Sequence, residues 1–209
     1  MCDLIQLLKS TLGRLDFINR RTTIFCSVKC SIGHPALRTK AELVRIEDLQ
    51  SAAFLRIVKD MNAVFNSPLH PVLGLAAAQI GHPIQLIAYQ ILDAQLIKEK
   101  GLGGPVPRTF IVNPVMSISD KTSPSKWAAE YEFCESLPKY SGLVRRAGHV
   151  HVTGLGLDGS TVNINARGFL ARILQHEIDH MEGILFVDRM EKHSLRHDDY
   201  VDKFEMFKR

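Results

Sequence analysis

Residues 175–180, near the C-terminal end, read QHEIDH, with two histidines four positions apart and a glutamate after the first. On an α-helix, positions i and i+4 differ by only about 40° around the axis. His176 and His180 would therefore project side by side and could bind one metal ion. Glu177, one step around the helix, could act as a general base toward a water at the metal. Apolar residues on both flanks predict burial, which favours a metal site over a helix with solvated polar side chains.

Two imidazoles leave a catalytic metal one protein ligand short of the usual three. The protease pattern H-E-x-x-H-x-x-G-x-x-H is followed as far as Gly183 but fails at Phe186, because an apolar ring cannot ligate. A downstream glutamate, Glu191 or Glu205, is one alternative, although both stand in a charged tail that looks solvated. The other alternative is the upstream residue Cys134, within EFCESLP.

Two segments have the periodicity of helices packed on a core. A C-terminal helix is predicted to begin after residue 165 and to end at Gly183 in a C-cap position. Residues 48–66 also place apolar side chains at i, i+3 and i+4 spacing. These side chains are Phe54, Ile57, Val58, Met61, Val64 and Phe65.

Strand signals lie between the two helices. Residues 85–91 and 109–117 are short and rich in apolar side chains, as strands are. Residues 149–165 alternate around Asp158-Gly159, which indicates a hairpin. The order helix, strands, hairpin, helix predicts an α+β fold with mainly antiparallel strands around a C-terminal metal-binding helix.

Length and composition limit the classes of protein that fit. A chain of 209 residues can bury one full core, and a second domain would be cramped. The net charge of +4 without a Lys/Arg run argues against specific nucleic-acid binding and allows only loose, transient contact with ribosomes. Apolar stretches are interrupted before the ~18 residues that a membrane span needs. Four cysteines without a secretory signal argue against a disulfide framework.

The N-terminal segment, residues 1–31, differs in composition from the rest. It contains five basic and two acidic residues together with several Ser and Thr, a pattern typical of a mitochondrial transit peptide. The alternative is a loosely packed extension. The catalytic domain is expected at residues 32–190, followed by the charged tail at residues 191–209.

Three stretches together resemble the peptide deformylase family: GLAAAQIG at residues 74–81, EFCESLP at residues 132–138, and QHEIDH. Their order and separations are similar to those of the family, and IGHPALRTKAELV extends the resemblance toward the N-terminus. The combination of CES with ARIL resembles the mitochondrial branch, which implies a location in the mitochondrial matrix. The resemblance implies removal of the formyl group from the N-terminal formyl-methionine of newly made polypeptides, with release of formate.

The resemblance also implies a ligand set and a base. Cys134, His176 and His180 would hold one divalent metal ion. One thiolate and two imidazoles suit Fe(II), zinc or cobalt, and the family favours Fe(II). Glu177 would take a proton from water and return it to the leaving amine.

Further roles follow from the same resemblance. The side chain of Gln79 and the backbone amide of Glu135 would donate to the oxyanion. Leu73, Gly74 and Leu75 would bind the substrate, whose backbone could approach the small residues of GLAAAQIG as an added β-strand.

Side chains near the ligands are expected to support them. Glu132 is expected to accept a hydrogen bond from a metal-binding histidine, and Arg146 is expected to pair with Asp179. Three positions depart from the family pattern, since Val72 and Phe133 stand where bacterial members usually have glycine and Glu135 replaces leucine. The carboxylate of Glu135 would repel acidic peptides and weaken activity.

Three hypotheses of function remain open at this point. The first is an active metal-dependent deformylase. The second is an H-E-x-x-H endopeptidase with a glutamate as its third ligand. The third is a catalytically weak or silent relative that binds nascent chains or the ribosome.

Overall fold

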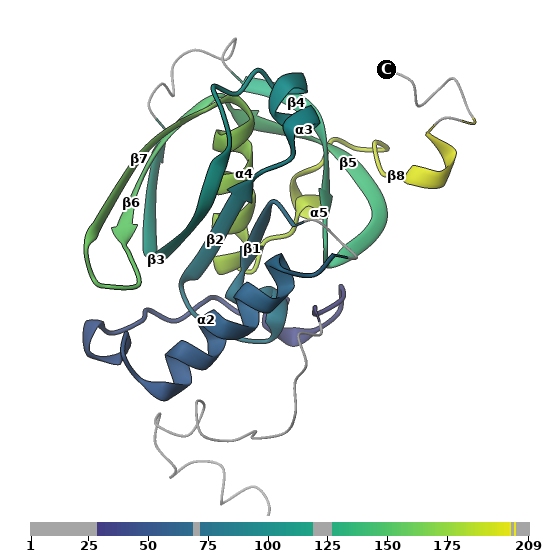
Figure 1. Cartoon of the computed structure of the whole chain (residues 1–209). Helices are drawn as coiled ribbons and strands as arrows, with labels where there is room; N and C mark the ends of the chain where they lie inside the picture. Colours follow the sequence, from purple (N-terminus) through teal and green to yellow (C-terminus); the bar gives the residue numbers. More distant parts are fainter. Residues whose placement is uncertain (1–28, 69–71, 119–126, 202, 204–209) are drawn as a thin grey trace, which may run out of the picture.

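The computed structural model describes residues 29–68, 72–118, 127–201 and 203 (Figure 1). Within these residues the chain forms two antiparallel sheets and four α-helices. The helices are α2 (Ala52–Phe65), α3 (Ala94–Glu99), α4 (Gly168–Met181) and α5 (Phe186–Arg189). The strands are β1 (Gly74–Ala76), β2 (Leu86–Ile91), β3 (Val106–Ile118), β4 (Trp127–Cys134), β5 (Leu137–Ala147), β6 (His149–Leu155), β7 (Thr161–Arg167) and β8 (Arg196–His197).

The larger sheet has the order β1-β2-β3-β6-β7, and the smaller has the order β4-β5-β8. Every pair of neighbouring strands is antiparallel. The hairpin predicted around Asp158-Gly159 is present as β6 and β7. The predicted class, α+β with mainly antiparallel strands, is confirmed.

Helix α2 packs on one face of the larger sheet. Ser51 caps it, because its Oγ accepts a hydrogen bond of 3.2 Å from the backbone N–H of Phe54. The helix therefore begins at residue 52 rather than at 48, and residues 46–48 form a 3-10 turn instead. The buried side chains of α2 are the six predicted from the sequence: Phe54, Ile57, Val58, Met61, Val64 and Phe65.

Strand β2 is buried on both faces because a helix covers each side of the sheet. Leu86 and Ala88 belong to the apolar cluster that contains the α2 side chains, whereas Ile87 and Tyr89 belong to the cluster that contains α4 side chains. In Figure 1, α4 lies behind β1 and β2, which it contacts, and it also contacts β5 of the smaller sheet. The helix that carries QHEIDH is thus held between the two sheets.

The ends of α4 explain its length. It begins at Gly168, later than predicted, because β7 continues to Arg167. Its C-terminus closes with Gly183 at φ +71°, where the N–H of Ile184 donates to the carbonyl of Asp179 at 3.0 Å. This is a Schellman motif, which requires the left-handed conformation that glycine adopts without strain. The predicted role of Gly183 at the end of the helix is confirmed.

Strands β1 and β5 were not predicted from the sequence, whereas β4 corresponds to a strand-like segment before Cys134. Strands β4 and β5 form a long ladder, in which Trp127 pairs with Ala147 at one end and Phe133 pairs with Ser141 at the other. A register shift follows at Cys134, the final residue of β4. This ladder supplies Glu132, Cys134 and Arg146 to the site described below.

The chain ends expected outside the catalytic domain are partly in contact with it. Residues 1–28 of the expected leader lie outside the described residues, whereas Cys30 is buried and donates its N–H to the carbonyl of Gln79 at 2.7 Å. In the expected tail, β8 pairs with Tyr140 and Ser141 of β5. The boundaries at residues 31 and 190 stay predictions. None of the helices in the described ranges is long and apolar enough to cross a membrane.

Candidate metal centre and active site

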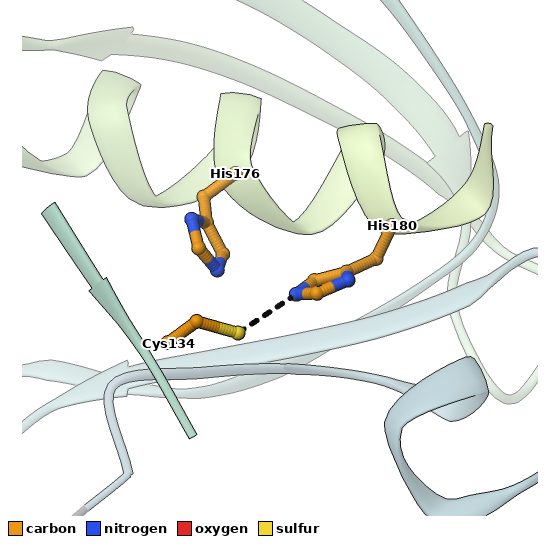
Figure 2. A group of neighbouring side chains, drawn as sticks. All are labelled: Cys134, His176 and His180. Atoms are coloured by element: carbon orange, nitrogen blue, oxygen red, sulfur yellow. Dashed lines mark hydrogen bonds between the residues drawn. The ribbon is translucent and has the colours of Figure 1, made fainter. Parts of the chain in front are cut away.

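Three potential metal ligands converge between β4 and α4. Cys134, His176 and His180 are buried, and their ligating atoms all lie within 4.8 Å of one another. Figure 2 shows the two imidazoles on one face of α4 with the cysteine opposite them, and the Sγ of Cys134 lies 3.3 Å from the Nε2 of His180. Ligand distances typical of zinc give a tetrahedral sulfur–nitrogen edge of about 3.6 Å. The arrangement therefore fits one metal ion.

The alternative third ligands are a glutamate at the surface and one outside the described residues. Glu191 lies at the surface, where its carboxylate is 3.2 Å from the guanidinium of Arg145. Glu205 lies outside the described residues. Phe186, at the position of the third protease histidine, is buried in an apolar cluster with Cys134. Of the described candidates, the cysteine is the one that lies beside the two histidines.

Glu132 orients the first histidine. The Nδ1 of His176 lies 2.6 Å from Oε1 of Glu132, which leaves Nε2 for a metal. Burial tends to raise the pKa of Glu132, but hydrogen bonds from His176 and Arg146 hold it well below its usual value. An ionised Glu132 keeps the proton of His176 on Nδ1, so the expected role of Glu132 is supported by the geometry.

The electrostatic environment favours a cation. Burial lowers the pKa of His180 well below its usual value, so this imidazole is neutral, as a ligand must be. Burial also tends to lower the pKa of His176, but the Cys134 sulfur and the Glu132 carboxylate raise it well above the usual value. A site that stabilises positive charge on an imidazole also stabilises a metal cation.

A buried network of charges supports these ligands. Arg146 binds Glu132 in a bidentate manner, at 2.7 and 3.1 Å, and also pairs with Asp179 as predicted. Arg172 donates to Glu132 at 3.2 Å and to the backbone carbonyl of Val144. Arg172 was not predicted, although it precedes His176 by four residues and so lies on the same face of the helix.

Glu177 is buried and faces the strand on the other side of the cleft. Burial raises its pKa to about 7, in the range of a general base near neutral pH. Within the described part of the chain its Oε2 has no hydrogen-bond partner. A Cβ built on Gly74 would overlap the carboxylate of Glu177. Gly74 therefore makes room for the base, a role that the sequence did not indicate.

Gln79 presents its amide nitrogen to the ligands. Its Oε1 accepts from the N–H of Ala76 at 2.8 Å, and its Nε2 lies 3.6 Å from the Sγ of Cys134. The backbone N–H of Ser136 also points to this sulfur, at 3.4 Å. Both N–H groups are hydrogen-bond donors to the sulfur of Cys134. The backbone amide of Glu135 lies in the turn between Cys134 and Ser136. Its donation to a substrate oxygen stays a prediction.

A cleft opens beside the ligands. Leu73 and Gly74 line it as expected, whereas the side chain of Leu75 is fully buried against α2 and does not reach it. Phe133 also lines the cleft and is 57% exposed. The remaining lining residues are Gln79, Tyr131, Glu132, Cys134, Glu135, Phe169, Arg172, Ile173, His176 and Glu177.

Two imidazoles, a cysteine sulfur and an unpaired buried glutamate beside an apolar cleft are the parts of a metal-dependent hydrolase. Residues 30–196 match the sequence model of the family described as Polypeptide deformylase. The chain therefore belongs to the polypeptide deformylase family.

Relatives come from bacteria and from plant organelles. The chain is 38% identical over 163 residues to "Peptide deformylase" of Thermomicrobium roseum, covering 78% of this chain and 84% of that protein. It is 36% identical over 177 residues to "Peptide deformylase 1A, chloroplastic/mitochondrial" of Arabidopsis thaliana, covering 81% of this chain and 63% of that protein. The chain also spans 59% of the length of the related chloroplastic tomato protein.

A solved structure has the same fold. The class I type b peptide deformylase of Acinetobacter baumannii, with Met-Ala-Ser bound, superposes with a TM-score of 0.66 at 29% identity. The match covers 78% of this chain and 97% of that chain. The same bacterial protein with actinonin bound gives a TM-score of 0.61.

Proposed function

We propose that this protein removes the formyl group from the N-terminal formyl-methionine of newly made polypeptides and releases formate. One observation carries the proposal: Cys134, His176 and His180 converge on one point, with the buried carboxylate of Glu177 beside them. The family and its relatives support the same activity. The endopeptidase hypothesis has less support because Glu191, its described glutamate ligand, is in a surface ion pair with Arg145.

Three residues would bind a cation, and a fourth would transfer a proton. Cys134, His176 and His180 would hold a divalent metal ion, which when bound activates water and polarises a carbonyl oxygen. Glu177 accepts the proton of the attacking water while the hydroxyl group joins the formyl carbon. Glu177 then passes this proton to the amine nitrogen as the C–N bond breaks. One water is consumed, and the products are formate and a peptide with a free N-terminus.

Two donors face the oxygen of the formyl group in this scheme. The Nε2 of Gln79 is directed toward the ligands because Oε1 is engaged by the N–H of Ala76. The backbone amide of Glu135 is the second donor. Negative charge on the oxygen grows as the water attacks, so both donors stabilise the transition state more than the substrate.

The peptide would bind along β1. This strand is the edge of the larger sheet, so one of its sides is open to an added strand. Leu73, Phe169 and Ile173 give the cleft apolar walls that suit a methionine side chain.

We propose Fe(II) as the native metal, on family grounds, with zinc or cobalt compatible with the same ligands. The location would be the mitochondrial matrix, supported by the acid-poor composition of residues 1–31 and by plant relatives from organelles. Contact with the ribosome would be transient, since the chain has a net charge of only +4.

The decisive experiment measures formate release from a formyl-Met-Ala-Ser peptide by anaerobically prepared protein. Glu177→Gln should lower the rate by at least about a hundredfold and should leave the bound metal in place. Cys134→Ala should lose metal and activity together. Metal content and sulfur coordination are measured on the same samples. Peptide binding without formate release by the wild type would instead identify a silent relative.

A further inference from the structure

Lys29 forms an ion pair with Glu135 at the cleft. It directly precedes the segment that matches the family model, residues 30–196, and falls within the expected leader. The side chain of Lys29 is 19% exposed and that of Glu135 is 25% exposed, so the pair is partly buried. Glu135 follows the ligand Cys134 and lines the cleft, at a position where the family resemblance led us to expect leucine.

Backbone hydrogen bonds hold Lys29 in this position. The N–H of Cys30 donates to the carbonyl of Gln79 at 2.7 Å, and the N–H of Ile32 donates to the carbonyl of Ser136 at 2.8 Å. Residues 29–32 therefore bridge the two turns that carry the proposed oxyanion donors. The ammonium group reaches Glu135 from the residue next to Cys30, whose backbone is bound to Gln79.

The charge of Glu135 matters because the proposed reaction builds negative charge nearby. A carboxylate in the cleft would oppose charge on the formyl oxygen, and it would do so strongly where water is partly excluded. Glu132 and Arg172, which also line the cleft, bind one another, whereas Oε2 of Glu177 has no hydrogen-bond partner among the described residues. Lys29 is the cation that faces Glu135.

We propose that Lys29 is a positioning residue that holds the Glu135 side chain and neutralises it toward the oxyanion and toward the peptide. The inference rests on the proposed function of the same site. It assigns Lys29 to the functional part of the chain, so removal of a leader after this residue would impair the enzyme.

Kinetics of four variants of the full chain test the proposal through its dependence on Glu135. Lys29→Met should lower kcat/KM for formyl-Met-Ala-Ser by about three- to tenfold, whereas Lys29→Arg should stay within about twofold of the wild type. Glu135→Gln removes the carboxylate and keeps the backbone amide, so its rate is the reference for the double variant. In the double variant Lys29→Met/Glu135→Gln, the loss caused by Lys29→Met should disappear.

A matched control is Lys40→Met, which breaks the ion pair of Lys40 with Glu182 on the surface, outside the cleft. It should leave kcat/KM unchanged. Thermal unfolding and metal content are measured for every variant. If Lys29→Met had the wild-type rate, or if the double variant were as slow as Lys29→Met, the proposal would be overturned.

A binding measurement keeps the test independent of turnover. The affinities of Met-Asp-Ser and Met-Lys-Ser are compared by titration calorimetry. Lys29→Met should shift their ratio about two- to fivefold toward the basic peptide, and Glu135→Gln in the same chain should remove the shift. An unchanged ratio would contradict the role of Lys29 even if the wild type released formate. Absence of formate with a shifted ratio would contradict only the proposed reaction.

Discussion

Charged side chains beneath the metal ligands differ in burial and in number of partners from those in exposed surface ion pairs. These surface pairs, called the rim below, are Arg38 with Asp188, Lys40 with Glu182 and Arg145 with Glu191. Arg146 and Glu132 have side chains only 5% and 6% exposed, and each contacts more than one charged partner. At the rim, Arg38 and Asp188 are 44% and 39% exposed and form a single ion pair with each other. The inner network is therefore a unit, whereas the rim consists of separate pairs.

The difference in burial determines how much each ion pair contributes to stability. A buried ion pair has lost its hydration, so removing one partner leaves an uncompensated charge and is strongly destabilising. An exposed pair remains hydrated and contributes little to stability. We therefore expect the inner network to determine folding and metal binding, and the rim to adjust stability and reactivity by small amounts.

The largest effect is expected for Arg146→Met. The substitution leaves the carboxylates of Glu132 and Asp179 buried with fewer partners, which should lower the free energy of unfolding by about 3–5 kcal/mol. Chemical denaturation measures this change. Arg145→Met is the matched control, because the Arg145 side chain is 57% exposed and pairs only with Glu191 at the surface. Equal losses of unfolding free energy in the two variants would contradict the proposed difference between the inner network and the rim.

Added volume in the inner region should affect catalysis more than stability. Gly74→Ala places a methyl group against the carboxylate of Glu177, which must move away from its position. Misplacement of a catalytic group by about 1 Å can lower the rate on the order of a hundredfold. We expect kcat for formate release to fall by this amount with the metal retained. Gly103→Ala, where nothing lies within 4 Å of the added carbon, should behave as the wild type.

Metal affinity tests the link between the network and the ligands. Glu132→Gln removes the charge that orients His176 and should weaken metal binding by about 10- to 100-fold. Competition with a chelator, followed by metal analysis, measures the change. Glu191→Gln is the control, because it removes a carboxylate from an exposed pair with Arg145 and should leave affinity unchanged. If both variants kept the wild-type affinity, the network would be structural only.

The smallest effect is expected at the rim. The hydrogen bond from Arg38 holds the pKa of Asp188 below its usual value. A depressed pKa in the folded state contributes stability that is present above the unfolded value, about 3.9, and is lost as the pH falls through the folded value.

Asp188→Asn should therefore lower stability by less than about 1 kcal/mol at pH 7. The difference from the wild type should shrink as the pH falls below about 4. Thermal unfolding across this pH range measures it, with Glu182→Gln as the control for another exposed pair. A loss as large as that of Arg146→Met would contradict the comparison.

Local patterns in the sequence determined the parts of the fold that depend on neighbours along the chain. Helical periodicity identified all six buried side chains of α2, and Gly183 marked the end of α4. The spacing of His176 and His180 placed both on one helical face, because the geometry of a helix is set within a few residues.

Only the tertiary structure decided which distant groups meet. Spacing alone left Cys134 and Glu191 as alternative ligands, and only the resemblance to the family favoured the cysteine. The pairing of β4 with β5 and their packing on α4 brought Cys134 to the histidines. The fully buried Leu75 and the contact of Lys29 with Glu135 were likewise not readable from the sequence. Sheet pairing and side-chain packing join residues far apart in the chain, so no local pattern records them.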